Sequence, residues 1–183
     1  MPAPLIARWT DWHGQGVEHL VLRQSSGLRL VQSVVIGPGT AAWQYALVCD
    51  LGWRTRSARL HRIGQDLAVE LRADGLGRWT DGVGRPLPEL QGALDLEIGV
   101  TPFTTTLALH RLGLRSGETA SLAMVQLDAD RLVFRRVERR LACLDRGRRY
   151  RLDTPEETEF EVEDNLLVTA WPGRFRRLVP QPA

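Results

Sequence analysis

Residues 67–75 read LAVELRADG, a short alternation of apolar and polar side chains that ends in a turn dipeptide. Successive side chains of a strand point to opposite faces, so the three aliphatic residues at 67, 69 and 71 share one face, and Glu70 and Arg72 share the other. The Asp-Gly pair at 74–75 tolerates the positive φ that a tight hairpin turn requires. This segment therefore predicts one arm of an antiparallel hairpin with one wet face.

The same pattern recurs along the chain. In residues 158–163, Phe160 and Val162 alternate with three glutamates, as in a strand buried on one side only. Turns rich in Gly and Asp separate the other predicted strands, which are Val17–Arg23, Leu28–Ile36, Trp43–Leu51, Trp53–Arg62, Leu94–Ile98, Glu118–Leu127, Leu132–Arg139, Arg148–Asp153, Leu166–Ala170 and Arg174–Val179. No repeat or linker is visible, and we predict one mostly β, antiparallel domain over residues 1–183.

One segment breaks the strand pattern. Thr101-Pro102 is typical of a helix start, since the Thr hydroxyl can accept hydrogen bonds from free backbone amides and Pro suits the first helical position. Gly113 is typical of a helix end. The residues between them are mainly apolar, so a helix here is expected to be buried on most sides. Because residues 104–106 are three β-branched threonines, we attribute this helix to tertiary packing rather than to local preference.

The composition is that of an ordinary globular protein. The 183 residues carry a net charge of +2, and all 24 basic residues are Arg. Codon bias is the favoured explanation of this usage and selection for guanidinium groups is the alternative, and composition does not separate the two. With charges nearly balanced, nucleic acid is not an expected partner. Because the N-terminus does not resemble a signal peptide and no apolar run is long enough for a membrane span, we expect a cytoplasmic location.

No pattern for catalysis, a metal or a cofactor is evident. The chain has four histidines, none of them paired at metal-ligand spacing, and it has no G-x-S-x-G nucleophile turn. The glycines of residues 75–77 and 82–84 match no phosphate-binding motif and indicate turns. Cys49 and Cys143 stand apart in apolar segments, which indicates buried thiols. We therefore expect no metal, no cofactor and no catalytic residues.

Trp and Arg alternate unusually in residues 53–59, WRTRSAR. This segment is polar on both faces, so either face would carry guanidinium or hydroxyl groups inward. One explanation is an edge strand with two wet faces. The other is a polar-lined cavity, in which an aromatic plane covers sugar or acyl CH groups and Arg holds oxygen atoms.

Several motifs in order resemble a known family. They are DGLGRW at 74–79, LQG at 90–92, DLE at 95–97 and TPFTTTL at 101–107, with Asp50 and WRTR at 53–56 before them, and Tyr150, Asp164 and the segments WP at 171–172 and FR at 175–176 after them. Together they resemble the bacterial family described as putative glycolipid-binding, formerly a domain of unknown function. The chain departs from the family pattern at Thr105, Ala108 and His110, where Asn, Pro and Arg are common.

The resemblance implies a many-stranded β-roll wrapped around one short α-helix, able to form a homodimer. Open sheet edges also favour pairing with a second copy. The resemblance implies a lipid-like or glycolipid-like ligand, bound without catalysis by a carrier or sensor. The alternatives are an enzyme for a similar ligand that uses Asp95, Glu97 or His110, and a dimeric interaction protein without a ligand.

The predicted ligand-binding residues combine aromatic groups, arginines and nearby polar groups. They are Trp53, Arg54, Arg56, Trp79, Asp95, Phe103, Thr105 and Arg111. Arg54 and Arg56 are predicted to point together into the roll, with Trp53 and Thr55 turned the other way. Inside, their charges would have to meet acids such as Asp74, Asp95 and Glu97, or an anionic ligand, because a lone buried charge is too unfavourable.

Overall fold

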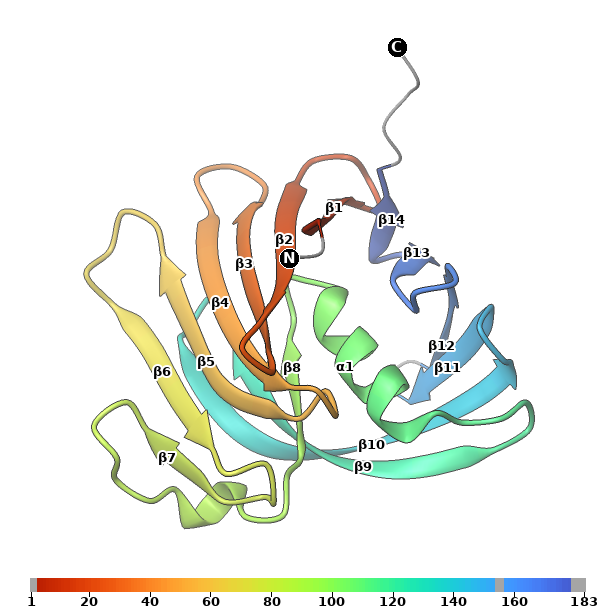
Figure 1. Cartoon of the computed structure of the whole chain (residues 1–183). Helices are drawn as coiled ribbons and strands as arrows, with labels where there is room; N and C mark the ends of the chain where they lie inside the picture. The colour runs from red at the N-terminus through yellow and green to blue at the C-terminus, as the bar shows by residue number, and fades with distance from the viewer. Residues whose placement is uncertain (1–2, 154–156, 179–183) are drawn as a thin grey trace.

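The computed structural model describes residues 3–153 and 157–178 and shows a strongly curved sheet wrapped around a central helix (Figure 1). The helix is α1 (Phe103–Leu112), and one 3-10 turn, η1 (Pro88–Leu90), precedes it. The strands are β1 (Leu5–Asp11), β2 (Val17–Ser25), β3 (Leu28–Ile36), β4 (Ala42–Asp50), β5 (Thr55–Arg62), β6 (Ala68–Ala73), β7 (Trp79–Asp81), β8 (Asp95–Ile98), β9 (Thr119–Asp128), β10 (Val133–Asp145), β11 (Arg149–Asp153), β12 (Glu157–Val162), β13 (Val168–Trp171) and β14 (Phe175–Arg177). The predicted mostly β roll around one helix is confirmed.

Neighbouring strands in the sheet are consecutive in the chain, except where the first strand, β1, pairs with the last, β14. Among the described residues the sheet runs β7-β6-β5-β4-β3-β2-β1-β14-β13-β12-β11-β10-β9-β8. Neighbouring strands are antiparallel, except that β8 and β9 are parallel. Parallel neighbours need a crossover connection, and α1 supplies it. The helix therefore lies inside the roll because the chain must cross from the end of β8 to the start of β9.

The hairpin predicted from residues 67–75 is present. β6 and β7 pair through Ala73 and Trp79, and Gly75 in the turn has φ +77°. The Asp74 side chain accepts hydrogen bonds from the backbone N–H groups of Leu76 and Arg78, which closes the turn. The aliphatic face is buried only at Leu71, because Leu67 lies before the strand and is exposed.

The helix matches its sequence signals within two residues. Thr101 Oγ1 accepts a hydrogen bond from the Phe103 N–H at 3.0 Å, and Gly113 ends the helix with φ +58°. The residues from Phe103 to Leu109 are all buried. The N-terminal threonines are thus held by packing inside the roll, as predicted.

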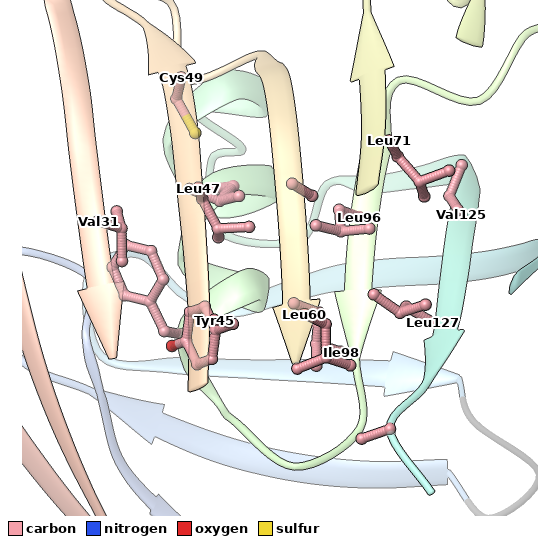
Figure 2. Close-up of a cluster of buried hydrophobic side chains, with 14 of the residues drawn as sticks. Val31, Tyr45, Leu47, Cys49, Leu60, Leu71, Leu96, Ile98, Val125 and Leu127 are labelled. Carbon is pink, nitrogen blue, oxygen red and sulfur yellow. The ribbon is translucent and has the colours of Figure 1, made fainter. Parts of the chain in front are cut away.

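The core lies on both sides of α1. Phe103 and Leu107 pack in a cluster with β1 to β9, part of which Figure 2 shows, with Leu47 and Leu60 opposite Leu96 and Val125. Ala108 and Leu109 pack in a second cluster with β9 to β13. Cys49 and Cys143 are buried free thiols, as expected.

Candidate functional site

A pocket of about 160 Å³ is lined by residues beside the β1–β2 turn and the β3–β4 turn and by Val100, which precedes α1. The two turns lie at the upper end of the roll in Figure 1. Its lining is mostly apolar and includes the side chains Trp9, Val35, Trp43, Val100 and Phe175. Both tryptophans have their indole N–H groups engaged outside the pocket, Trp9 with the Val168 carbonyl and Trp43 with the Ala129 carbonyl. The two rings are therefore fixed as apolar walls.

Two glycines keep the rim of the pocket narrow. A Cβ atom on Gly37 would lie 2.7 Å from the Trp43 ring, and a Cβ atom on Gly16 would lie 2.8 Å from the Ile36 carbonyl oxygen and 2.9 Å from Asp11 Oδ2. Real Cβ atoms do not approach other atoms this closely, so the present geometry needs glycine at both positions.

Glu18 is the polar group of this pocket, and it is only 3% exposed. It lies on the inner face of β2, opposite Trp9 of β1. Its Oε1 atom accepts hydrogen bonds from Ser33 Oγ at 2.7 Å, Tyr45 Oη at 2.5 Å and Thr101 Oγ1 at 3.0 Å. Its Oε2 atom is buried and has no hydrogen-bond partner among the described residues. One carboxyl oxygen is thus anchored, and the other is buried without a partner among the described residues.

The surroundings of Glu18 favour its neutral form. Burial raises the pKa of Glu18 from 4.5 to about 7, although hydrogen bonds from Tyr45, Ser33 and Thr101 act in the opposite direction. Burial and the nearby Glu18 charge raise the pKa of Tyr45 well above its ordinary value, so the phenol remains a donor. Because three hydroxyls occupy Oε1, a proton on this acid belongs on Oε2. Near neutral pH, Glu18 can accept a hydrogen bond or donate one.

Asp11, at the rim of the pocket, has a different environment. Its Oδ1 atom accepts hydrogen bonds from the backbone N–H groups of His13 and Gln15, and it holds the β1–β2 turn. Burial alone would raise the pKa of Asp11, but the surrounding backbone N–H groups lower it overall. Asp11 Oδ2 also lacks a hydrogen-bond partner within the described ranges. The pocket therefore has a carboxylate that stays ionised at its rim and a readily protonated carboxyl group inside.

The predicted site residues Asp95 and Arg111 form a buried ion pair. Arg111 donates from Nε to Asp95 Oδ1 at 2.9 Å and from Nη2 to Asp95 Oδ2 at 2.5 Å. Asp95 is 2% exposed and the Arg111 side chain 16%. The pair joins the end of α1 to β8, and both oxygens of the acid are engaged within the protein.

Glu97, a candidate acid or base, is engaged as well. Arg139 donates to its Oε2 atom at 3.0 Å, and Gln126 donates to its Oε1 atom at 2.9 Å. With Thr105, Glu97 borders a second cavity, between α1 and the inner faces of β9 to β11, of only about 10 Å³. That volume is about the space of one water molecule, so this side of the helix is closed to an organic ligand.

The prediction that Arg54 and Arg56 point into the roll is wrong. Both are exposed, and Thr55 is the buried residue. The cause is a bulge, because Cys49 pairs with Thr55 while Val48 pairs with Ser57, so Arg56 is an extra residue. The bulge turns both Thr55 and Ala58 toward the core. Arg56 instead lies above Gly75 and 3.9 Å from Asp50. The edge-strand explanation is also wrong, since β5 lies between β4 and β6.

Trp53 precedes β5 instead of starting it. It has φ +64°, and its ring stacks on His110 at 4.0 Å between ring centroids. The Arg29 guanidinium lies 4.1 Å from the centre of the same ring. His110 is tied further through Nε2 to the Asn165 carbonyl, and burial lowers the pKa of His110. This stack joins β3, the β4–β5 turn and the end of α1.

The other predicted aromatic residues are part of the packed interior. Trp79 is buried and donates its indole N–H to the Ala93 carbonyl at 2.8 Å. Phe103 is fully buried in the first core cluster. Neither residue lines the 160 Å³ pocket. The structure thus separates the eight predicted residues into core, ion pair and surface, and their contact with a ligand stays a prediction.

A larger surface hollow, about 480 Å³, lies beside the β10–β11 turn. Its lining is mainly charged and includes Asp145, Arg148, Arg149, Glu161 and Asp164. It offers no aromatic wall and mixes both signs of charge, so it matches an amphipathic ligand less well than the pocket around Glu18.

Comparison with known proteins agrees with this architecture. The sequence model of the family described as "Putative glycolipid-binding" matches residues 6–177. The chain belongs to this family. A crystal structure of a DUF1089 family protein from Pseudomonas aeruginosa has a TM-score of 0.76 and 28% identity to this chain, and the match covers 97% of this chain and 94% of that one. A comparison with curated proteins gives no match.

This member of the family has no metal-binding cluster in the part of the chain that the structure describes. Within residues 3–153 and 157–178, no helix has the length and hydropathy that a membrane span requires.

Glu18 was not among the predicted site residues, because the sequence of β2 does not show which of its faces is buried. Apolar residues occur on both faces of residues 17–22, so alternation does not say which face is buried. The signal that could have found it lies in the neighbouring strands, where Ser33 and Tyr45 occupy inward positions directly opposite each other. A carboxylate, a hydroxyl and a phenol on one inner face indicate a polar site within an apolar wall.

Proposed function

We propose that this chain binds a glycolipid-like amphipathic molecule without transforming it, and that one sugar ring of the head group enters the pocket between Trp9, Trp43 and Glu18. The observation that carries the proposal is the Glu18 Oε2 atom, which is buried and unpartnered within the described chain and belongs to a residue that lines an apolar pocket. A buried polar atom without a partner is unfavourable, and a ligand hydroxyl would remove that cost.

The size of the pocket limits what it holds. A dry cavity of about 150 Å³ accommodates benzene, so a pocket of about 160 Å³ has room for no more than one ring. Pockets that enclose a whole drug-sized molecule are larger, at about 300–1,000 Å³. The acyl chains of a glycolipid must therefore remain outside this pocket.

The chemistry of the walls suits a sugar. The CH groups of a pyranose form an apolar face that packs on an aromatic ring, and its hydroxyls need hydrogen-bond partners. Trp9 and Trp43 offer fixed rings whose own N–H groups are engaged. Glu18, with its pKa near 7, can serve a hydroxyl as donor or acceptor. The description of the family as glycolipid-binding supports the same ligand class.

A titration tests the proposal. Octyl β-D-glucoside, below the concentration at which it forms micelles, is expected to bind saturably to the purified protein in isothermal titration calorimetry. Val100 is half-buried and lines the pocket, so Val100→Trp should fill the pocket and abolish this binding. Val133→Trp, at an exposed position on β10, is the matched control and should bind as the wild type does. Equal binding by the wild type and Val100→Trp would exclude this pocket.

A second candidate function is hydrolysis of a glycosidic bond. The observation that favours it is the pair of pocket carboxyls with opposite pKa shifts, Asp11 lowered and Glu18 raised. It ranks second because a glycosidase must hold groups on both sides of the bond, and this pocket holds one ring. Release of nitrophenol from p-nitrophenyl glycosides by the wild type, but not by Glu18→Gln, would favour it over binding alone.

The predicted enzyme based on Asp95, Glu97 and His110 gains no comparable support, since each of these groups is engaged by a different partner. The cytoplasmic location and the homodimer remain part of the proposal. Native mass spectrometry of the purified protein would measure both a co-purified lipid and the number of chains.

A further inference from the structure

The outer face of β1, β2 and β3 is unusually apolar. It exposes Ile6, Val17, Leu28, Leu30, Val34 and Ile36, each of them 36–53% accessible. Across the sheet, Val17 lies opposite Ile36 and Ile6 lies opposite Val21. Polar or basic side chains lie between the others, since His19 is opposite Val34 and Arg23 is opposite Leu30. Apolar side chains that gather on one exposed face mark a surface that something covers.

β3 shows the feature most clearly. Its inward residues Val31, Ser33 and Val35 are buried, while Leu30, Val34 and Ile36 on its outer side are exposed. Strands with apolar residues on both faces usually belong to sheets covered on both sides. Here the inner face meets the core, and the outer face meets no other described element.

The charged side chains on the outer face of β1, β2 and β3 themselves are basic, namely Arg8 and Arg23. Acids occur only at its border, where Asp50 of β4 lies opposite Leu28 and close to Arg56. Residues 3–49 contain two acids, Asp11 and Glu18, of which one holds a turn and the other is buried inside the roll. No ion pair to Arg8 or Arg23 occurs within the described ranges.

A second copy of the chain is a poor partner for this face. In a two-fold dimer the same patch meets itself, which would bring the arginines of β1 and β2 toward each other, and the outer face of β1–β3 carries no carboxylate to balance them. An anionic lipid surface complements both features, because its charge attracts guanidinium groups and its acyl region accepts aliphatic side chains. We infer that the outer face of β1–β3 docks on an anionic lipid bilayer.

The position of the pocket agrees with this inference. Val17 and Ile36 belong to the exposed face and also line the pocket around Glu18. A bilayer seated on this face would therefore lie beside the pocket opening, where a lipid head group could enter. The docking itself does not depend on the proposed sugar site, because Leu30, Val34 and both arginines of the face lie outside that pocket.

Vesicle sedimentation tests the inference. The wild type should sediment with vesicles of phosphatidylcholine and phosphatidylglycerol at about 3:1 and much less with phosphatidylcholine alone, and added salt should weaken binding. Arg8→Glu/Arg23→Glu should reduce partitioning by about tenfold or more. Val34→Ser/Ile36→Ser should also reduce it, since it removes aliphatic contacts. Arg140→Glu/Arg149→Glu, at exposed positions on β10 and β11, is the charge-matched control and should bind normally.

The following outcomes would overturn the inference that this face docks on an anionic bilayer. Equal sedimentation with both vesicle types, or none with either, excludes docking on an anionic bilayer. A wild-type dimer that Val34→Ser/Ile36→Ser converts to a monomer, in light scattering without vesicles, would assign the face to a second copy. Circular dichroism establishes that the variants are folded. Octyl glucoside binding by Arg8→Glu/Arg23→Glu should persist, so failure of docking and failure of the sugar site are distinguishable.

Discussion

The roll buries carboxyl groups in two regions and compensates them differently. On β8, Asp95 and Glu97 each meet a guanidinium, from Arg111 and Arg139 respectively. On β2, Glu18 meets only hydroxyl groups, and one of its oxygens has no partner in the described chain. The first arrangement keeps charges paired and joins the helix and sheet. The second keeps a carboxyl group that can change its proton and accept a new contact, which is the difference between a structural acid and a candidate binding group.

Removing the ion pair between Arg111 and Asp95 should have the largest effect on stability. Arg111→Met leaves Asp95 buried without its cation, so the free energy of unfolding should fall by about 3–5 kcal/mol. Urea denaturation at pH 7 measures this change. Arg115→Met, at an exposed position after the helix, is the control and should cost little. A loss below about 1 kcal/mol for Arg111→Met would show that the ion pair is not structurally important.

Glu18, which is surrounded by hydroxyl groups, should make the stability of the protein depend on pH. Because the folded pKa of Glu18 is about 7 and its ordinary value is 4.5, the folded chain holds an extra proton between these values. Stability from this group is therefore present at low pH and lost as pH rises from about 4.5 to 7, by up to about 3 kcal/mol. Glu18→Gln should remove this slope in denaturation curves measured across the window. Glu89→Gln, at an exposed acid, should leave the slope intact, and an unchanged slope in Glu18→Gln would contradict the assignment.

Thr101 links the two regions, since it belongs to the start of α1 and donates to Glu18. Thr101→Ala should lower stability by about 0.5–2 kcal/mol, because it removes both a helix cap and a partner of a buried acid. Thermal unfolding measures the loss. Thr101→Ser keeps the hydroxyl and should recover most of it; equal losses in both variants would indicate that the methyl group, not the hydroxyl, is important.

Replacing Arg56 should have the smallest effect on stability and on ligand binding. Its side chain is 42% exposed and lies 3.9 Å from Asp50, a geometry in which ion pairs contribute about 0–1 kcal/mol. Arg56→Ala should therefore change neither the melting temperature nor glucoside affinity appreciably. A clear loss of affinity in calorimetry would return the ligand site to the arginines of residues 54–56 that the sequence favoured.

The sequence allowed the fold to be predicted much better than the site. Hairpin turns and the helix limits depend on local chemistry, as at Gly75 and Gly113, and both are found where expected. The orientation of Arg54 and Arg56 depends on the bulge opposite Val48 and Cys49, which strand alternation does not reveal. Two strands, β1 and β7, were also missed, the second because three residues carry little periodic signal.

The candidate site was harder to predict than the fold for a further reason. Glu18, Tyr45 and Thr101 are far apart in sequence and meet only because β2, β4 and the start of α1 face the same interior. Asp95 and Arg111 were both predicted to bind a ligand, but sequence alone could not show that they pair with each other. Tertiary register therefore decided which polar residues were satisfied.

The tryptophan indole N–H signals test the central claim most directly. The chain has six tryptophans, of which Trp9 and Trp43 line the pocket and Trp53 and Trp79 do not. In a ¹⁵N-labelled sample titrated with octyl β-D-glucoside, the assigned Trp9 and Trp43 signals should shift saturably, while those of Trp53 and Trp79 stay in place. Shifts at Trp53 and Trp79 without shifts at Trp9 and Trp43 would contradict the account and place the ligand elsewhere.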